Sequence, residues 1–365
     1  MKVFFHVQHL LGIGHLRRAA TLAQALRAAG CDVTLASGGM PVSGIPVLQL
    51  PPASSDASFK QLLDERGRPV DDAWKARRRD ALLAAWRASD ADVLMIELFP
   101  FGRRQMRFEL LPLLDAAKAR ARKPLVVCSA RDLIQWRPTR EPEMLHAFER
   151  YFDRLLVHGD PAVARFNFGL AEKIADRTHY TGYVVADLEK KDVGSGEVLV
   201  SVGGGAVGGP ILEAALAARP LTSLRAHPWR LLAGINAPEA QLASLRDSAG
   251  PGVTVERARE DFTARLGNCV LSISQAGYNT VAELLQARVR AVLVPFAAGG
   301  EAEQTLRARL LAERGAAVTV AESEITVEKL AQAVNRAARL PRPAADLVDL
   351  DGARRSAELI MKWAS

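Results

Sequence analysis

The sequence has few cysteines, no long apolar run and no cluster of residues with metal-ligand spacing. Cys31, Cys128 and Cys269 are the only cysteines among 365 residues. They lie far apart, each in or beside an apolar strand-like run, which is typical of reduced core thiols in a cytosolic protein. No apolar run approaches the roughly 18 residues that a membrane span needs. We therefore expect a cytoplasmic protein without a transmembrane helix.

The N-terminal segment and the distribution of charge argue against two further classes. His6, Gln8 and His9 interrupt the first apolar run and no small-residue cleavage pattern follows, so no secretory signal is expected. The net charge of +7 is scattered over predicted helices, not gathered in a basic stripe with interleaved aromatics, so we expect no nucleic-acid partner.

One predicted helix leaves a peripheral contact with the inner face of a membrane open. Trp74 and Trp86 lie on this helix, and tryptophans beside basic residues are typical of contacts with anionic headgroups. Its basic residues are Lys75, Arg77, Arg78 and Arg79.

Short apolar runs of strand length alternate with segments of helical periodicity, which predicts an α/β fold. A length of 365 residues exceeds the usual size of one domain, so we expect two Rossmann-like domains. The predicted parts are an N-terminal domain over 1–186, a polar linker over 187–196, a C-terminal domain over 197–345, and a segment over 346–365 whose helix crosses back to the first domain.

The most informative stretch is 268–308. A strand predicted at 269–273 leads into the turn from Ser274 to Gly277 and then into a helix. The N–H groups of a helix's first turn have no partner within the helix, and the helix dipole adds about half a positive charge there. This turn therefore predicts an anion site that fits a diphosphate.

Two other segments repeat the strand-turn-helix arrangement. A strand at 291–295 leads to a helix from about residue 301, with Glu303 and Gln304 at its start. A strand at 197–202 leads into a glycine-rich loop, which is not a Walker loop because no Gly-Lys-Ser/Thr is present. This loop begins with Gly203, Gly204 and Gly205.

Glu283 has two possible roles that its sequence context leaves open. Thr280 and Glu283 have the spacing of a capping box, in which the carboxylate accepts a hydrogen bond from the Thr280 N–H. Alternatively, Glu283 accepts hydrogen bonds from the two hydroxyls of a ribose, as acidic residues near phosphate-binding helices do.

The loop between the first strand, 2–9, and the first helix, 15–29, contains Gly12, Gly14 and His15. A dinucleotide-binding loop is disfavoured, because Arg17 replaces its third glycine and Asp32 begins the second strand instead of ending it. His15 is either a surface histidine in the first helical turn or a functional residue.

Polar and aromatic residues also follow the predicted strand at 93–98. Glu97 ends it; Phe99 and Phe101 could line a sugar or lipid pocket, and Arg103 and Arg104 either bind an anionic acceptor or are simply solvated. Arg131 follows the next strand on the same rim. A D-x-D formed by Asp90 and Asp92 precedes the strand, whereas ligands bind past the carboxyl ends, so no metal site is expected there.

Two motifs resemble known families. The pattern S-x-x-G-x-x-T-x-x-E from Ser274 to Glu283, followed by a strand ending in Pro-Phe and by Gln304, resembles the nucleotide-sugar signature of family-28 glycosyltransferases, the MurG-like enzymes that make peptidoglycan lipid II. The loop with Gly12, His15 and Arg18 is similar to the first loop of that family. It is also similar to that of UDP-sugar hydrolases of pseudaminic acid synthesis.

The resemblance implies the GT-B architecture, two Rossmann-like domains facing across a cleft. It implies that Glu283 binds the ribose of UDP and that Gln304 touches the sugar; Glu303 replaces a glutamine usual in the family, which leaves the sugar open. The implied nucleotide-sugar residues are Gly203, Gly204, Gly205, Ser274, Gly277, Asn279, Thr280, Glu283, Glu303 and Gln304. The acceptor-side residues are Gly12, Gly14, Arg18, Phe99, Arg103, Arg104 and Arg131.

We expect an inverting glycosyltransferase that needs neither metal nor cofactor and moves a hexose or N-acetylhexosamine from a UDP-sugar to a hydroxyl of a glycan or lipid acceptor of the cell envelope. His15, or alternatively Glu97, would act as the catalytic base. Two alternatives remain: a UDP-sugar hydrolase with water as acceptor, and a non-catalytic nucleotide-sugar sensor.

Overall fold

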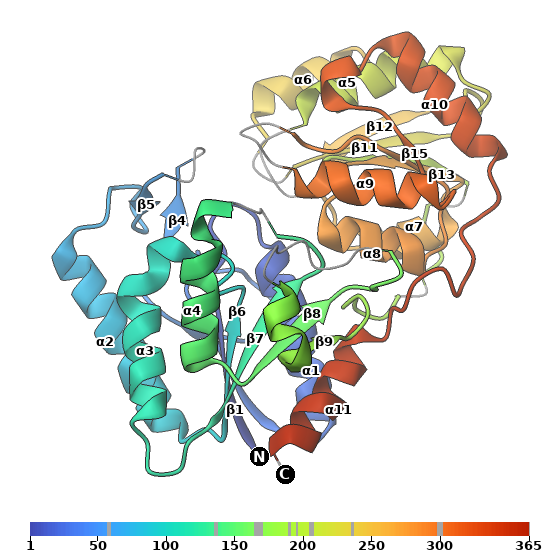
Figure 1. The fold of residues 1–365 in the computed structure, drawn as a ribbon. Helices are drawn as coiled ribbons and strands as arrows, with labels where there is room; N and C mark the ends of the chain where they lie inside the picture. The colour runs from blue at the N-terminus through green and yellow to red at the C-terminus, as the bar shows by residue number, and fades with distance from the viewer. Residues whose placement is uncertain are drawn as a thin grey trace. The chain divides into compact units, whose positions relative to one another are not determined.

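The computed structural model divides the chain into two α/β units (Figure 1). Unit 1 comprises Met1–Val184 and Asp349–Ser365, and unit 2 comprises Val185–Val348. Each unit has its own parallel sheet and its own hydrophobic core. The structure describes residues 1–56, 60–134, 138–163, 171–188, 191–194, 196–203, 208–234, 237–297 and 302–364.

A seven-stranded sheet forms the centre of unit 1, and its strand pairs are parallel. Across the sheet the strands are β3 (Leu48–Gln49), β2 (Asp32–Ser37), β1 (Lys2–Val7), β6 (Val93–Glu97), β7 (Leu125–Arg131), β8 (Arg154–His158) and β9 (Thr178–Tyr180). Two short strands, β4 (Ser54–Ser55) and β5 (Leu62–Leu63), pair antiparallel as a separate sheet.

Helices cover both faces of this sheet (Figure 1). Successive β1 side chains alternate between the faces, so Phe4 joins one apolar cluster while Val3 and Phe5 join the other. The Phe4 face packs on α2 (Asp72–Ser89), α3 (Arg107–Lys118) and α4 (Glu141–Tyr151), and the opposite face on α1 (Gly14–Ala28) and α11 (Gly352–Ala364). The 3₁₀ segments are η1 (Arg104–Met106), η2 (Pro138–Arg140) and η3 (Ala171–Arg177), and η3 is kinked at Ile174.

Unit 2 has a six-stranded parallel sheet. Its strands are β12 (Val253–Arg257), β11 (Trp229–Ala233), β10 (Val198–Ser201), β13 (Leu271–Ser274), β14 (Ala291–Leu293) and β15 (Val318–Thr319). Figure 1 shows α5 (Gly209–Ala218), α6 (Glu239–Asp247) and α10 (Val327–Arg339) on one face, and α7 (Phe262–Asn268), α8 (Tyr278–Gln286) and α9 (Glu303–Glu313) on the other. The 3₁₀ segments η4 (Arg219–Leu221) and η6 (Glu322–Glu324) complete the unit.

Both sheets reverse their strand order at a central pair. The chain first builds outward from β1 to β3 and then continues from β6 on the other side of β1. Unit 2 does the same at β10 and β13. Ligands of open parallel sheets bind past the carboxyl ends of strands at such a switch point. The fold therefore nominates one region in each unit: the loops after β1 and β6, and the loops after β10 and β13.

The segment predicted as a linker is held by unit 2. The Asn268 side-chain amide donates to the carbonyls of Lys191 and Val193 at 2.9 Å each. The Gln286 amide donates to the Ala186 carbonyl at 2.9 Å. The first chain crossing between the units therefore lies at 184/185, before the polar segment 187–196. The second lies at 348/349, and α11 packs against α1 in unit 1.

The tryptophans of α2, on which the possible membrane contact was argued, are buried in the structure. Trp74 is only 4% exposed and lies near Phe108, and Trp86 is 2% exposed with its ring edge-on to Phe4. Arg78 is fully buried. These side chains face the core because α2 packs against the sheet and α3. No helix in the described part of the chain is both long and apolar enough to cross a membrane.

Candidate functional site

The switch point of unit 1 brings His15 and Glu97 together. His15 lies in the first turn of α1, directly after the loop that follows β1, and Glu97 is the last residue of β6. His15 Nδ1 is 2.6 Å from Glu97 Oε1. Arg18, one helical turn further along α1, donates from Nη2 to the same carboxylate oxygen. Two residues that the sequence offered as alternative bases thus form one hydrogen-bonded group.

The electrostatics of this group keep His15 neutral and Glu97 ionised. Burial lowers the pKa of His15 from 6.5 to about 3; Glu97 opposes this shift, and Arg103 and Arg18 add to it. Burial alone would raise the pKa of the Glu97 carboxyl, but His15, Arg18 and Arg103 outweigh it and hold that pKa well below its usual value. The carboxylate is 1% exposed, whereas the His15 side chain is 17% exposed. Only the imidazole is therefore open to a substrate.

The hydrogen bond to Glu97 also selects the tautomer of His15. An ionised carboxylate can only accept, so at 2.6 Å the Nδ1 atom must carry the proton and donate it. Arg18 Nη2 is further from Nδ1, at 3.4 Å, and instead serves the carboxylate. Nε2 of His15 then holds a lone pair, which is what a general base requires.

The other arginines predicted on the acceptor side have different environments. Arg103 has a left-handed backbone with φ 57°, and its Nε lies 4.0 Å from Glu97 Oε2, so it contributes to the charge around the carboxylate. Arg104 is exposed and pairs with Glu143 at 3.6 Å. Arg18 is 3% exposed and Arg131 is partly buried at the end of β7. Gly12 is exposed in the loop after β1 with free space where a Cβ would lie, and Gly14 begins α1.

The structure does not support a pocket lined by Phe99 and Phe101. Their exposed fractions are 1% and 5%, and both belong to the core between the sheet and the helices. Phe99 lies beside Phe152, and Phe101 beside Phe148. The chain turns inward directly after β6, which the spacing of apolar residues in a loop cannot reveal.

The switch point of unit 2 joins two glycine-containing turns. Ser201 and Ser274, the last residues of β10 and β13, are register partners. Gly203 follows β10 with φ +73°, a conformation that favours glycine. Gly208, φ +113°, precedes α5, and a Cβ there would overlap Val202. Gly204 and Gly205 lie outside the described residues.

The capping-box interpretation of Glu283 is wrong. The helix after β13 begins at Tyr278 with Gly277 as N-cap, and the Val281 N–H donates to the Gly277 carbonyl at 2.9 Å. Thr280 is therefore the third residue inside α8, and Glu283 lies in the middle of the helix, partly exposed. Asn279 and Thr280 are partly exposed in the first turn, at the positive end of the helix dipole. Ser274 is fully buried beneath this turn.

The start of α9 approaches the same turn. Gln304 is partly exposed, and its side-chain oxygen accepts from the Phe296 N–H at 3.2 Å, which leaves its amide N–H groups as donors. Glu303 is buried, at 3% exposure. Arg307, which sequence reasoning missed, is 1% exposed and donates from Nη1 to the Ala276 carbonyl at 2.9 Å. In the sequence, a buried arginine of a helix looks the same as a solvated one, so no sequence signal identified Arg307.

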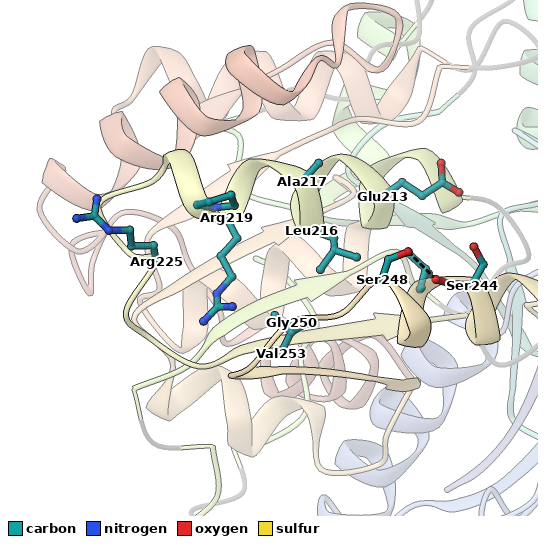
Figure 2. A pocket seen from close by; sticks show the side chains of 11 residues that line it. Glu213, Leu216, Ala217, Arg219, Arg225, Ser244, Ser248, Gly250 and Val253 are labelled. Carbon is teal, nitrogen blue, oxygen red and sulfur yellow. Dashed lines mark hydrogen bonds between the residues drawn. The ribbon is translucent and has the colours of Figure 1, made fainter.

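Two further observations limit the chemistry and the location of the candidate site. Among the described residues, no group of three or more His, Cys, Asp or Glu side chains is placed to hold a metal ion. Unit 2 also has a hollow of about 650 Å³ between the carboxyl-terminal halves of α5 and α6 (Figure 2). Its lining includes Leu216, Arg219 and Ser248, which lie at the amino edge of the sheet, away from the switch point. We do not assign the nucleotide site to it.

Comparison with known proteins gives a family for part of the chain. Residues 199–346 match the glycosyltransferase family 28 C-terminal domain. The chain is 33% identical over 110 residues to the UDP-N-acetylglucosamine--N-acetylmuramyl-(pentapeptide) pyrophosphoryl-undecaprenol N-acetylglucosamine transferase of Anaeromyxobacter sp. (strain K), covering 28% of this chain and 29% of that protein. It is 32% identical over 182 residues to the protein of the same name from Rhodospirillum centenum (strain ATCC 51521 / SW), covering 46% of each. The chain thus spans less than half the length of these curated relatives.

Solved structures resemble the whole chain. The glycotransferase of kitacinnamycin has a TM-score of 0.65 at 17% identity and covers 100% of this chain and 99% of its own. MurG of Acinetobacter baumannii has a TM-score of 0.62 at 18% identity, covering 99% of both chains. A Streptomyces sp. SF2575 glycosyltransferase complexed with thymidine diphosphate has a TM-score of 0.60 at 17% identity, also covering 99% of both. This likeness confirms the predicted fold class, GT-B with two Rossmann-like domains.

Proposed function

Because residues 199–346 match the glycosyltransferase family 28 C-terminal domain and the chain has the GT-B fold, we propose that the protein transfers a sugar from a UDP-sugar to an acceptor hydroxyl with inversion at the anomeric carbon. The names of the matching relatives favour N-acetylglucosamine as the sugar and a lipid-linked glycan as the acceptor. The observation that carries the proposal is the contact between His15 and the buried Glu97 at the unit 1 switch point.

In the proposed reaction, His15 Nε2 takes the proton from the acceptor hydroxyl as its oxygen attacks the anomeric carbon. A carbon–oxygen bond to the acceptor forms while the bond from the anomeric carbon to the diphosphate oxygen breaks, and UDP leaves with both electrons of that bond. Glu97 accepts from Nδ1–H throughout and stabilises the imidazolium that forms. Glu97 is thus a positioning residue, and His15 is the base.

We assign the binding of the UDP-sugar donor to unit 2. The first turn of α8 and the turn after β10 offer backbone N–H groups and a positive helix end to the diphosphate, which would stabilise the leaving charge. Glu283 would accept from the ribose hydroxyls, and the Gln304 amide would donate to the sugar. The contacts support UDP and thymidine diphosphate equally, since they involve no base, and we propose UDP from the relatives.

The first test is His15→Ala. Loss of a general base lowers kcat by roughly 100-fold or more, while UDP affinity should stay within a few fold because the nucleotide residues lie in unit 2. In the wild type, the acidic limb of kcat/KM should lie well below pH 6.5, because protonation of His15 requires a pH near its lowered pKa. The measurements are steady-state kinetics across pH and calorimetry with UDP.

The matched control is His146→Ala, which changes an exposed histidine of α4 and should leave kcat unchanged. A His15→Ala variant with wild-type kcat would contradict the proposal. Product analysis separates transfer from hydrolysis, which the similarity of the His15 loop to UDP-sugar hydrolases makes the second candidate. Release of free sugar from UDP-sugar at an undiminished rate without any acceptor would establish hydrolysis.

A further inference from the structure

Arg78 is a fully buried arginine in the middle of α2 whose side chain bonds to four segments of unit 1. Its Nε lies 2.7 Å from Glu109 Oε2, and its Nη2 donates to Glu109 Oε1 at 3.0 Å. Nη2 also donates to Gln8 Oε1 at 2.8 Å, and Nη1 donates to the carbonyls of Gly38 and Pro51. We call Arg78, Glu109, Gln8, Gly38 and Pro51 the Arg78 network.

The segments that Arg78 joins share one location. Gln8 directly follows β1, Gly38 directly follows β2, and Pro51 follows β3, so all three lie at the carboxyl edge of the sheet. A Cβ at Gly38 would overlap Arg78 Nη2 and Gln8 Oε1, so the loop packs directly against the guanidinium. The loops therefore form a single packed rim around one cation.

The network continues toward the catalytic histidine. The Gln8 amide donates to the His9 carbonyl at 2.7 Å and to the Ala53 carbonyl at 3.2 Å. The His9 ring Nε2 lies 3.1 Å from the Met40 carbonyl oxygen, and a Cβ at Gly39 would overlap that ring. The loop that starts at Gln8 ends where α1 begins, one residue before His15. Fixing its first residues limits where the imidazole can lie.

A buried ion pair by itself contributes little net free energy to the stability of a protein. Replacing a buried ion pair by well-packed apolar side chains of similar volume is often neutral or stabilising, so the Arg78–Glu109 pair is weak evidence for a stabilising role. A guanidinium presents five N–H donors in a rigid plane, and here it reaches a carboxylate, a side-chain amide and two carbonyls together. A lysine ammonium has three donors on one atom and cannot span these acceptors.

We propose that Arg78 is a positioning residue for the acceptor half of the reaction: it locks the loops after β1, β2 and β3 into one rim, which fixes His15 and the surface that receives the acceptor. This role rests on the proposed glycosyl transfer. It assigns no role to Arg78 in donor binding, since the nucleotide residues are in unit 2.

The experiment compares Arg78→Lys with Arg265→Lys. Arg265 is a similarly buried, ion-paired arginine of unit 2, with Nη1 3.0 Å from Glu197, so its exchange controls for general destabilisation. For Arg78→Lys we expect acceptor KM to rise and kcat to fall, together by about 10-fold or more in kcat/KM. UDP affinity should stay within about two-fold. Arg265→Lys should leave acceptor kinetics unchanged.

Amide hydrogen exchange gives a readout that does not need turnover. Residues 8–14 and 38–41 should exchange faster in Arg78→Lys and not in Arg265→Lys, whether or not the wild type proves to be a transferase. A wild type without transfer would therefore refute the proposed function while the exchange data still decide the positioning role. If Arg78→Lys does not fold, Glu109→Gln, which keeps the acceptor for Nη2 but removes the charge, is measured in the same way.

Three results would overturn the inference. The first is unchanged exchange in residues 8–14 of a folded variant. The second is faster exchange with unchanged kcat and acceptor KM in an active enzyme. The third is an equal loss of UDP affinity and acceptor kinetics, which would mean that the substitution loosens the whole protein.

Discussion

Glu97 determines which nitrogen of His15 carries the proton, and its replacement tests the role that we propose for the pair. Glu97→Gln removes the carboxylate that pairs with Arg18 and that we propose to stabilise the imidazolium, so kcat should fall by roughly 100-fold while UDP affinity is kept. Because Glu97 raises the pKa of His15, any acidic limb that remains should move to still lower pH. Kinetics across pH measure both effects.

The control is Glu143→Gln, which changes a more exposed glutamate that pairs with Arg104. It should leave kcat and the pH profile unchanged. A Glu97→Gln variant with normal kcat would mean that the contact with His15 is only structural.

Glu283 is tested by nucleotide affinity. Since α8 begins at Tyr278, the carboxylate is not part of a capping box, which leaves the ribose contact as its predicted role. Glu283→Gln should weaken UDP binding by roughly 1 to 3 kcal/mol, the value of a hydrogen bond to a charged group. Calorimetry measures this, with Glu313→Gln at the exposed end of α9 as control. An unchanged affinity in a folded variant would remove Glu283 from the site.

At the scale of single residues, the sequence predicted candidate site residues better than it predicted the contacts between them. His15 and Glu97 were both candidates, but their separation of 82 residues in sequence conceals the contact, which exists only because β6 pairs with β1. The sequence placed Arg78 among the exposed basic residues of its helix and did not identify Arg307, because a buried arginine and a solvated one have the same sequence context. Phe99 was assigned to a pocket because burial depends on the path of the loop.

Among the elements of unit 2, a closed ring of six alternating charges connects the residue before β10 with β11, β12 and α7. Glu197 pairs with Arg230 and Arg265, Glu256 with Arg230 and Arg259, and Asp261 with Arg259 and Arg265. Hydrogen bonds from the two arginines outweigh the effect of burial and lower the pKa of Asp261 from 3.8 to about 2. The free energy of unfolding at acidic pH should therefore depend on the ionisation of Asp261.

A carboxylate with a lowered folded-state pKa stabilises the protein above its unfolded-state pKa, and that contribution is lost as pH falls through the folded-state value. Asp261→Asn should thus cost about 1 kcal/mol of unfolding free energy at pH 7, with the difference disappearing between about pH 4 and pH 2. Urea unfolding at several pH values measures this. Asp346→Asn, at an exposed aspartate, is the control. A pH-independent difference would contradict the assignment to ionisation.

Element positions followed from periodicity, but their ends depended on local geometry. The strands predicted at 93–98 and 197–202 are observed as Val93–Glu97 and Val198–Ser201, each within one residue at either end. The helix after β13 starts earlier than the Thr280 motif suggests, because Gly277 is extended, with ψ 149°, and the helical hydrogen bonds begin from its carbonyl. A four-residue motif does not predict at which preceding residue the helix begins.

For the molecule as a whole, the alternation of strands and helices together with the family resemblance of two motifs predicted the GT-B fold. Solved structures confirm that fold, and the family match confirms the resemblance for residues 199–346. The strand order within each sheet was not predicted. It depends on pairings between strands that are distant in sequence, such as β10 with β13, and periodicity carries no information on pairing.

Metal independence of the proposed transfer is a prediction at the scale of the whole protein. If helix N-termini stabilise the leaving diphosphate, as proposed, then turnover should persist within about two-fold in excess EDTA and should not require added Mg²⁺ or Mn²⁺. The measurement is product formation after metal removal, with a metal-dependent glycosyltransferase assayed in parallel. Abolition by chelator and recovery with a divalent cation would contradict the proposed stabilisation.

The route of the chain has a consequence for synthesis on the ribosome. Unit 2 is one continuous segment, Val185–Val348, whereas the core of unit 1 includes Ala357 and Ile360 of α11. Domains generally fold as units as the chain emerges, N-terminal first. Here unit 1 lacks part of its core until α11 leaves the exit tunnel, and by then all of unit 2 has been made. Unit 2 should therefore reach its native state before unit 1, the reverse of their order in the gene.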